Sequence, residues 1–177
     1  MRGLIIFLQC LMLILGNNAV HAQKGFKGKP TGLEKISSSN LSFEKQVLVL
    51  VNAERKKFNL KPLKLDENLT QAARYHCKDM AEENYFGHSS QDRNGNSLSF
   101  VCKSYERMMK FDNTFTLYAE NISAGQRTPH AVVQDWMDSP GHRKNILDPR
   151  FTHIGLAFIK VDTGEYFYFW GQAFGRK

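Results

Sequence analysis

The stretch His153–Phe174, "HIGLAFIKVDTGEYFYFWGQAF", decides the fold that the sequence predicts. It contains two apolar runs joined by Asp162-Thr163-Gly164, which is typical of two strands connected by a turn. The second run is apolar and aromatic at nearly every position, whereas a strand with one solvent-facing side alternates apolar and polar residues. We therefore expect helices to cover both faces of the sheet to which these strands belong.

Amphipathic segments precede these strands. Apolar residues recur at helical spacing over residues 43–58 and 69–81, and Thr128-Pro129 is a typical helix start. The sequence also predicts a loop over residues 92–97 and a shorter helix over residues 98–109 that carries Cys102. Helices lead and strands close the chain. This order predicts an α+β fold, a three-layer α-β-α sandwich with a mainly antiparallel central sheet.

The N-terminal residues 1–22 have the composition of a secretory signal peptide. Arg2 precedes an apolar run from Leu4 to Leu15, which is shorter than the roughly 20 residues of a membrane-spanning helix, and small residues precede Gln23. An uncleaved N-terminal anchor is the alternative. We expect residues 1–22 to be removed, residues 23–40 to form a flexible segment and residues 41–177 to form one domain. The mature protein should then be secreted, either extracellular or periplasmic, without a transmembrane segment.

Removal of the signal peptide leaves two cysteines, Cys77 and Cys102. A disulfide between them is the first expectation for an exported chain, because its compartment is oxidising. Two buried free thiols are the alternative. A zinc site built on these cysteines is less favoured, since neither has a second Cys or His at the usual short spacing.

The chain is basic, with a formal net charge of +7. Such a balance favours anionic partners such as lipid headgroups, cell-wall polymers or glycans, although a basic solvated face is the more ordinary interpretation. No nucleic-acid-binding motif accompanies the charge, so nucleic acid is not an expected partner.

Three residues are candidates for a functional site. His88 in "FGHSS" and His142 in "PGHRKN" each follow a glycine directly after a helical pattern breaks. Glu120 in "YAENIS" has apolar neighbours, and a partly buried carboxylate needs a partner. Two imidazoles and a carboxylate that converge would form a metal site or an acid–base cluster. Spacing alone does not show that they converge, and a tight polar turn around His142 that only fixes packing is the alternative.

Longer motifs in the chain resemble those of a known family. They are "LVNAERKKFNLKPLKLDENL", "MAEENYFGHSS", "YAENIS" and "VVQDWMDSPGHRKNILDPRFTHIGLAF". Together they resemble the CAP superfamily of cysteine-rich secretory proteins, venom allergens and plant pathogenesis-related proteins, and in particular its compact form in exported bacterial proteins. The resemblance covers about residues 41–174 and implies the same α-β-α sandwich.

The resemblance also implies a central cleft with two histidines and two acidic residues. His88 and His142 match the two histidines, and Glu120 matches the first acidic residue. The position of the second acidic residue is held by Ser139. Asp138 is a possible replacement, although adjacent helix residues point about 100° apart.

The metal and the function follow from the same resemblance. His88, His142 and Glu120 would bind a divalent metal, zinc being the best match, and Arg143 would lie at the cleft rim or pair with a carboxylate. A cleft that binds a lipid, a sterol or another cell-surface ligand is the first function expected. A structural or signalling module is the second, and a metal-dependent or His/Glu-assisted hydrolase is the third, since the H-E-x-x-H and G-x-S-x-G motifs are absent. No residue is assigned a catalytic role.

Overall fold

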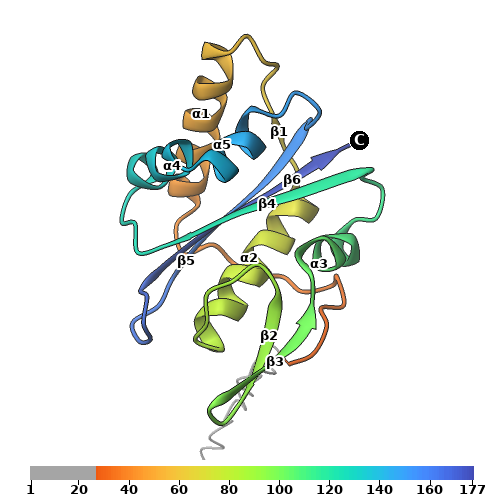
Figure 1. The fold of residues 1–177 in the computed structure, drawn as a ribbon, viewed down its shortest axis with the longest axis vertical. Coiled ribbons are helices and arrows are strands. Elements are labelled where there is room, and N and C mark those ends of the chain that lie inside the picture. The colour runs from red at the N-terminus through yellow and green to blue at the C-terminus, as the bar shows by residue number, and fades with distance from the viewer. Residues whose placement is uncertain (1–26) are drawn as a thin grey trace, which may run out of the picture.

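The structure is a computed structural model that describes residues 27–177, and the expected signal peptide lies outside the described residues (Figure 1). Its helices are α1 (Leu41–Lys57), α2 (Glu67–Glu82), α3 (Ser104–Phe111), α4 (Pro129–Asp138) and α5 (Pro140–Leu147). Its strands are β1 (Lys64–Leu65), β2 (Ser90–Asn94), β3 (Ser97–Cys102), β4 (Leu117–Ala124), β5 (His153–Lys160) and β6 (Tyr168–Arg176).

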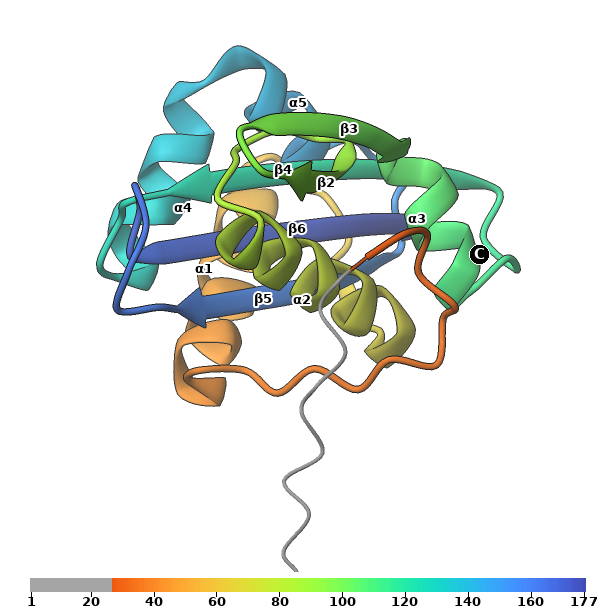
Figure 2. The same cartoon turned by 90° about the horizontal axis from the view of Figure 1, so that it is seen from below.

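A four-stranded sheet with the order β1-β5-β6-β4 forms the middle layer. β1 pairs with β5 in parallel, whereas β5 with β6 and β6 with β4 are antiparallel, so the sheet is mixed. Helices α1, α4 and α5 cover one face, and α2 and α3 with the β2–β3 hairpin cover the other (Figures 1 and 2). The predicted α+β three-layer sandwich is confirmed.

Strand β6 shows why both faces of the sheet must be covered by helices. Phe169 and Ala173 belong to the apolar cluster that includes Met80 of α2, whereas Trp170 and Phe174 belong to the cluster on the α1 and α4 side. Alternate side chains of one strand therefore enter two separate cores. Full burial of each large apolar side chain stabilises the fold by roughly 1.5–3 kcal/mol.

Close packing of α2 on β5 fixes the helix that lies beside the candidate site. A Cβ atom added at Gly155 would lie 2.0 Å from the carbonyl carbon of Leu69, so only glycine permits this approach. The N–H of Asp66 donates to the carbonyl oxygen of Ile154 at 2.9 Å and anchors the start of the helix.

The predicted helix over residues 98–109 is wrong in its first half. Residues 90–102 form the β2–β3 hairpin, which turns at Gly95, and α3 begins only at Ser104. Leu98 and Phe100 alternate with serines, which is a strand period of two residues that a helical reading of the segment overlooks.

Residues 27–40, hereafter the N-terminal strap, are the described part of the 23–40 segment and lie against the domain. The Ile36 side chain is buried, and its N–H donates to Gln71 Oε1 at 2.7 Å. The N–H of Ser39 donates to the carbonyl oxygen of Phe158 at 3.0 Å. The strap follows the α2 and α3 side of the molecule before it enters α1 (Figure 2).

The predicted disulfide is not formed in the structure. Cys77 and Cys102 are both buried free thiols. Cys77 faces β6, where a Cβ atom at Gly171 would lie 2.9 Å from its sulfur, whereas the Cys102 side chain makes a hydrogen bond with Ser90. The two sulfurs thus face different neighbours. Burial raises the pKa of both thiols.

Candidate functional site

The candidate site is centred on a buried carboxylate of the edge strand β4. The side chain of Glu120 is 4% exposed, and its Oε1 lies 3.0 Å from Nδ1 of His88. Its Oε2 accepts a hydrogen bond from the guanidinium of Arg107 on α3, which is itself fully buried. The charge of the carboxylate is therefore compensated inside the protein, as burial requires.

Arg107 organises the rest of the site. Its guanidinium also donates to Ser90 Oγ at 2.9 Å and to the carbonyl oxygen of His88 at 3.2 Å. One side chain thus fixes the carboxylate, the backbone of His88 and the first residue of β2. Arg107 was not identified from the sequence. The only indication of such a residue was the expectation that a buried Glu120 needs a partner.

The ionised carboxylate of Glu120 fixes the orientation of the His88 ring. Burial raises the pKa of Glu120, but Arg107, His76 and His88 together outweigh burial and lower it to about 2. Because the carboxylate is ionised and only accepts, His88 donates from Nδ1. The Nε2 atom lies at the other edge of the ring, on a side chain that is 55% exposed.

His76 of α2 lies behind this pair. Its Nε2 is 3.9 Å from Glu120 Oε1 and 2.8 Å from the carbonyl oxygen of Gly87, the residue before His88. Burial is the largest cause that lowers the pKa of His76, to about 3, so the ring is neutral at neutral pH. A histidine on the apolar face of a helix is expected to be structural, and the contact of His76 with Gly87 agrees with that role.

His142 reaches the same region from the other helical layer. It lies in the first turn of α5, after Ser139 has ended α4 and begun α5. Asn121 Nδ2 donates to the carbonyl oxygen of His142 at 3.1 Å, and Asn145 Nδ2 donates to that of Glu120 at 3.3 Å, so α5 is tied to β4. Burial and then the nearby His88 lower the pKa of His142.

Three further residues were expected near the cleft. Asp138 is exposed and accepts a hydrogen bond from Gln134 of its own helix at 2.9 Å. The Arg143 guanidinium lies 5.3 Å from the ring centroid of Phe58, a cation–π contact with the end of α1. Ser139 joins two helices and makes no side-chain capping bond.

Asp135 is a carboxylate near His142 that sequence reasoning missed. Its charge opposes the lowering of the His142 pKa. Asp135 Oδ2 accepts hydrogen bonds from Ser123 Oγ of β4 at 3.2 Å and from Gln126 Nε2 at 2.8 Å. The resemblance to the CAP superfamily placed the second acidic position at Ser139, with Asp138 as its replacement. In the structure it is Asp135 of α4 that contacts the sheet, through Ser123 of β4.

The donors present do not fit the expected zinc centre. Within residues 27–177, no three His, Cys, Asp or Glu side chains are grouped so that they could hold a metal ion. Both oxygens of Glu120 are engaged, one by Arg107 and the other by His88. Two imidazoles remain, whereas protein zinc sites supply three or four ligands.

Comparisons with known proteins agree with the fold. The family model described as the cysteine-rich secretory protein family, CAP, matches residues 48–174. The YkwD protein of Bacillus subtilis is 43% identical over 137 residues, which are 77% of this chain and 48% of that protein. The chain thus spans about half the length of this relative.

Two solved structures are similar. An extracellular protein of Bacillus anthracis that contains an SCP domain is 32% identical with a TM-score of 0.64, over 77% of this chain and 41% of that one. An outer surface protein of Borrelia burgdorferi is 22% identical with a TM-score of 0.68, over 81% of this chain and 99% of that one. Within residues 27–177, no helix is long and apolar enough to cross a membrane. The chain belongs to the CAP family of cysteine-rich secretory proteins.

Proposed function

We propose that this protein is a secreted CAP-domain module that binds a cell-surface ligand through the region of His88 and His142. The expected signal peptide supports export. The similar proteins described as extracellular or as an outer surface protein support the same compartment.

The observation that carries the proposal is the arrangement of Glu120 between Arg107 and His88. The buried ion pair holds the imidazole in one orientation, and the half-exposed ring presents Nε2 to a ligand. His142, whose pKa burial lowers, adds a second imidazole nearby. Two imidazoles can exchange hydrogen bonds with a ligand that carries hydroxyl groups, such as a glycan, a sterol or a lipid headgroup.

Turnover is less well supported than binding. A carboxylate that orients an imidazole also occurs in catalytic triads, but these add a nucleophile within hydrogen-bond reach of the imidazole. Within residues 27–177, no Ser, Thr or Cys side chain makes a hydrogen bond with the ring of His88 or His142. Glu120, held by Arg107 with a pKa of about 2, is also a poor proton acceptor at neutral pH.

A binding panel tests the proposal. The ligands are vesicles of anionic phospholipid, the same vesicles loaded with sterol, and soluble cell-wall glycan fragments. Wild type should bind one class, and His88→Ala and His142→Ala should each weaken that binding, whereas His130→Ala at an exposed helix start is the matched control.

Two outcomes would replace the proposal. Equal binding by wild type and both site variants would favour a structural or signalling module. A hydrolytic rate on ester, peptide or glycan substrates that disappears in folded Glu120→Gln would favour an enzyme.

A further inference from the structure

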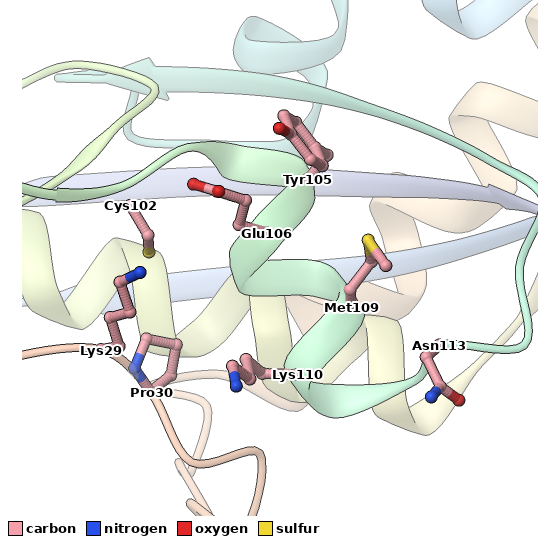
Figure 3. A pocket seen from close by; sticks show the side chains of 8 residues that line it. All are labelled: Lys29, Pro30, Cys102, Tyr105, Glu106, Met109, Lys110 and Asn113. Atoms are coloured by element: carbon pink, nitrogen blue, oxygen red, sulfur yellow. The ribbon is translucent and has the colours of Figure 1, made fainter.

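A second candidate site lies on the α3 side of the molecule. A pocket of about 420 Å³ separates the N-terminal strap from α3. Its lining comprises Lys29, Pro30, Cys102, Tyr105, Glu106, Met109, Lys110 and Asn113 (Figure 3). None of these residues belongs to the group around Glu120, and the volume falls within the range of small-molecule sites.

The strap wall of this pocket is held at both ends. On one side of the pocket, the N–H of Gly28 donates to both carboxylate oxygens of Asp92, at 3.1 and 2.9 Å. On the other side, Gly32 has a φ of +85°, and a Cβ atom there would lie 1.9 Å from the carbonyl oxygen of Lys110. Lys29 and Pro30 cross the pocket between these two anchors. The pocket is therefore formed before any ligand arrives, which reduces the ordering cost of binding.

The pocket is positively charged. Lys29 and Lys110 are both exposed, and neither forms an ion pair with any residue in 27–177. The one carboxylate in the lining, Glu106, accepts the N–H of Lys103 at 2.8 Å and so caps the start of α3. Two lysines without carboxylate partners favour an anion.

The remaining lining is apolar enough to hold more than an inorganic anion. Tyr105 is 46% exposed and Met109 is 45% exposed, one turn apart on α3. In Figure 3 the Lys29 side chain extends from the strap toward Cys102, and Pro30 lies beside it on the strap. Exposed apolar side chains next to unpaired cations suit a ligand with both properties.

We propose that the pocket between the strap and α3 binds an organic anion with a compact apolar body. The negative group lies between Lys29 and Lys110, and the apolar body packs against Pro30, Tyr105 and Met109. This site is independent of the proposed function of His88, so His88→Ala should leave it intact.

Two probes that differ in one charged group test the proposal. Isothermal titration uses 8-anilinonaphthalene-1-sulfonate as the apolar anion and N-phenyl-1-naphthylamine as its neutral counterpart. Wild type should bind the anion at one site and more tightly than the neutral probe. Lys29→Glu/Lys110→Glu should weaken anion binding by at least about fivefold, the upper worth of a single exposed ion pair, and change neutral binding less than about twofold.

Control variants separate the pocket from general charge effects. Lys56→Glu/Lys160→Glu makes the same change of charge at exposed positions outside the pocket and should retain anion binding. Tyr105→Ser/Met109→Ser should weaken both probes. Equal affinity of wild type for the two probes, or the same loss in both double lysine variants, would overturn the proposal.

Discussion

Removing the cation of the buried pair is the most informative perturbation of the Glu120 site. Arg107→Met keeps an unbranched side chain in place of the aliphatic part of arginine but leaves the Glu120 carboxylate with His88 as its remaining close partner. Glu120 has a pKa of about 2 instead of 4.5, which corresponds to about 3 kcal/mol of favourable interactions. Ser90 Oγ and the His88 carbonyl oxygen lose their donor as well. We expect Arg107→Met to lower the free energy of unfolding by about 4 kcal/mol at pH 7, within the usual range of about 3–5 kcal/mol for breaking a buried pair.

A double-mutant cycle tests whether this loss comes from the stranded charge. Glu120→Gln in the Arg107→Met background removes the unpaired carboxylate and should restore about 2 kcal/mol, although Glu120→Gln alone is destabilising. Urea unfolding of all four proteins, followed by circular dichroism, gives the four free energies. Losses that simply add would refute the coupling between Arg107 and Glu120.

The pH dependence provides a second test of the same variant. Without Arg107, burial dominates and raises the pKa of Glu120 above its unfolded value, so the variant should regain stability as the pH falls from 7 to 5. In wild type the pKa is depressed. Its contribution is therefore complete above about pH 4.5 and is lost as the pH falls toward 2. A variant whose loss stays constant from pH 7 to 5 would contradict this explanation.

Three further predictions concern buried groups. Burial raises the pKa of Asp79 to about 7 even though Tyr85 donates to it, so the unfolding free energy of wild type should fall as the pH rises from about 4 to 7. Asp79→Asn should therefore be more stable than wild type at pH 8, by up to about 4 kcal/mol, but not at pH 4. Identical pH profiles of the two proteins in urea unfolding would contradict this. Glu120→Ala should lose about 1–3 kcal/mol more stability than Glu120→Gln, since it strands its donors; equal unfolding midpoints would count against a buried hydrogen-bonded carboxylate. Cys77 and Cys102 should both be alkylated when secreted protein is unfolded without reductant, and mass analysis that finds neither labelled would restore the disulfide.

The layers of the fold could be predicted from the sequence because the apolar residues of each element indicate which of its faces are buried. The residues of β6 are apolar on both faces, and only a sheet between two helical layers satisfies them. The start of α4 was equally predictable from Thr128-Pro129, since Thr128 accepts the N–H of Ala131 and proline follows it. The β2–β3 hairpin was missed because its short apolar alternation also fits a helix turn over so few residues.

The candidate site was predictable only in part, for a different physical reason. His88, Glu120 and His142 were identified by motif, and the structure pairs the first two and brings the third near them. Arg107 and Asp135 were not identified, because their importance depends on contacts with elements distant in the sequence. A charged residue on a short helix is usually exposed, and only the fold reveals that Arg107 is buried against Glu120.

Native mass spectrometry of the protein, purified under mild conditions from its own secretion medium, tests the central claim most directly. If the His88 region binds a ligand, wild type should carry an organic adduct that His88→Ala loses and His130→Ala keeps. Wild type should also leave ester, peptide and glycan substrates unchanged during incubation. Wild type that emerges without an adduct would contradict this account. So would an adduct shared by His88→Ala, or a metal ion bound in a His88-dependent manner.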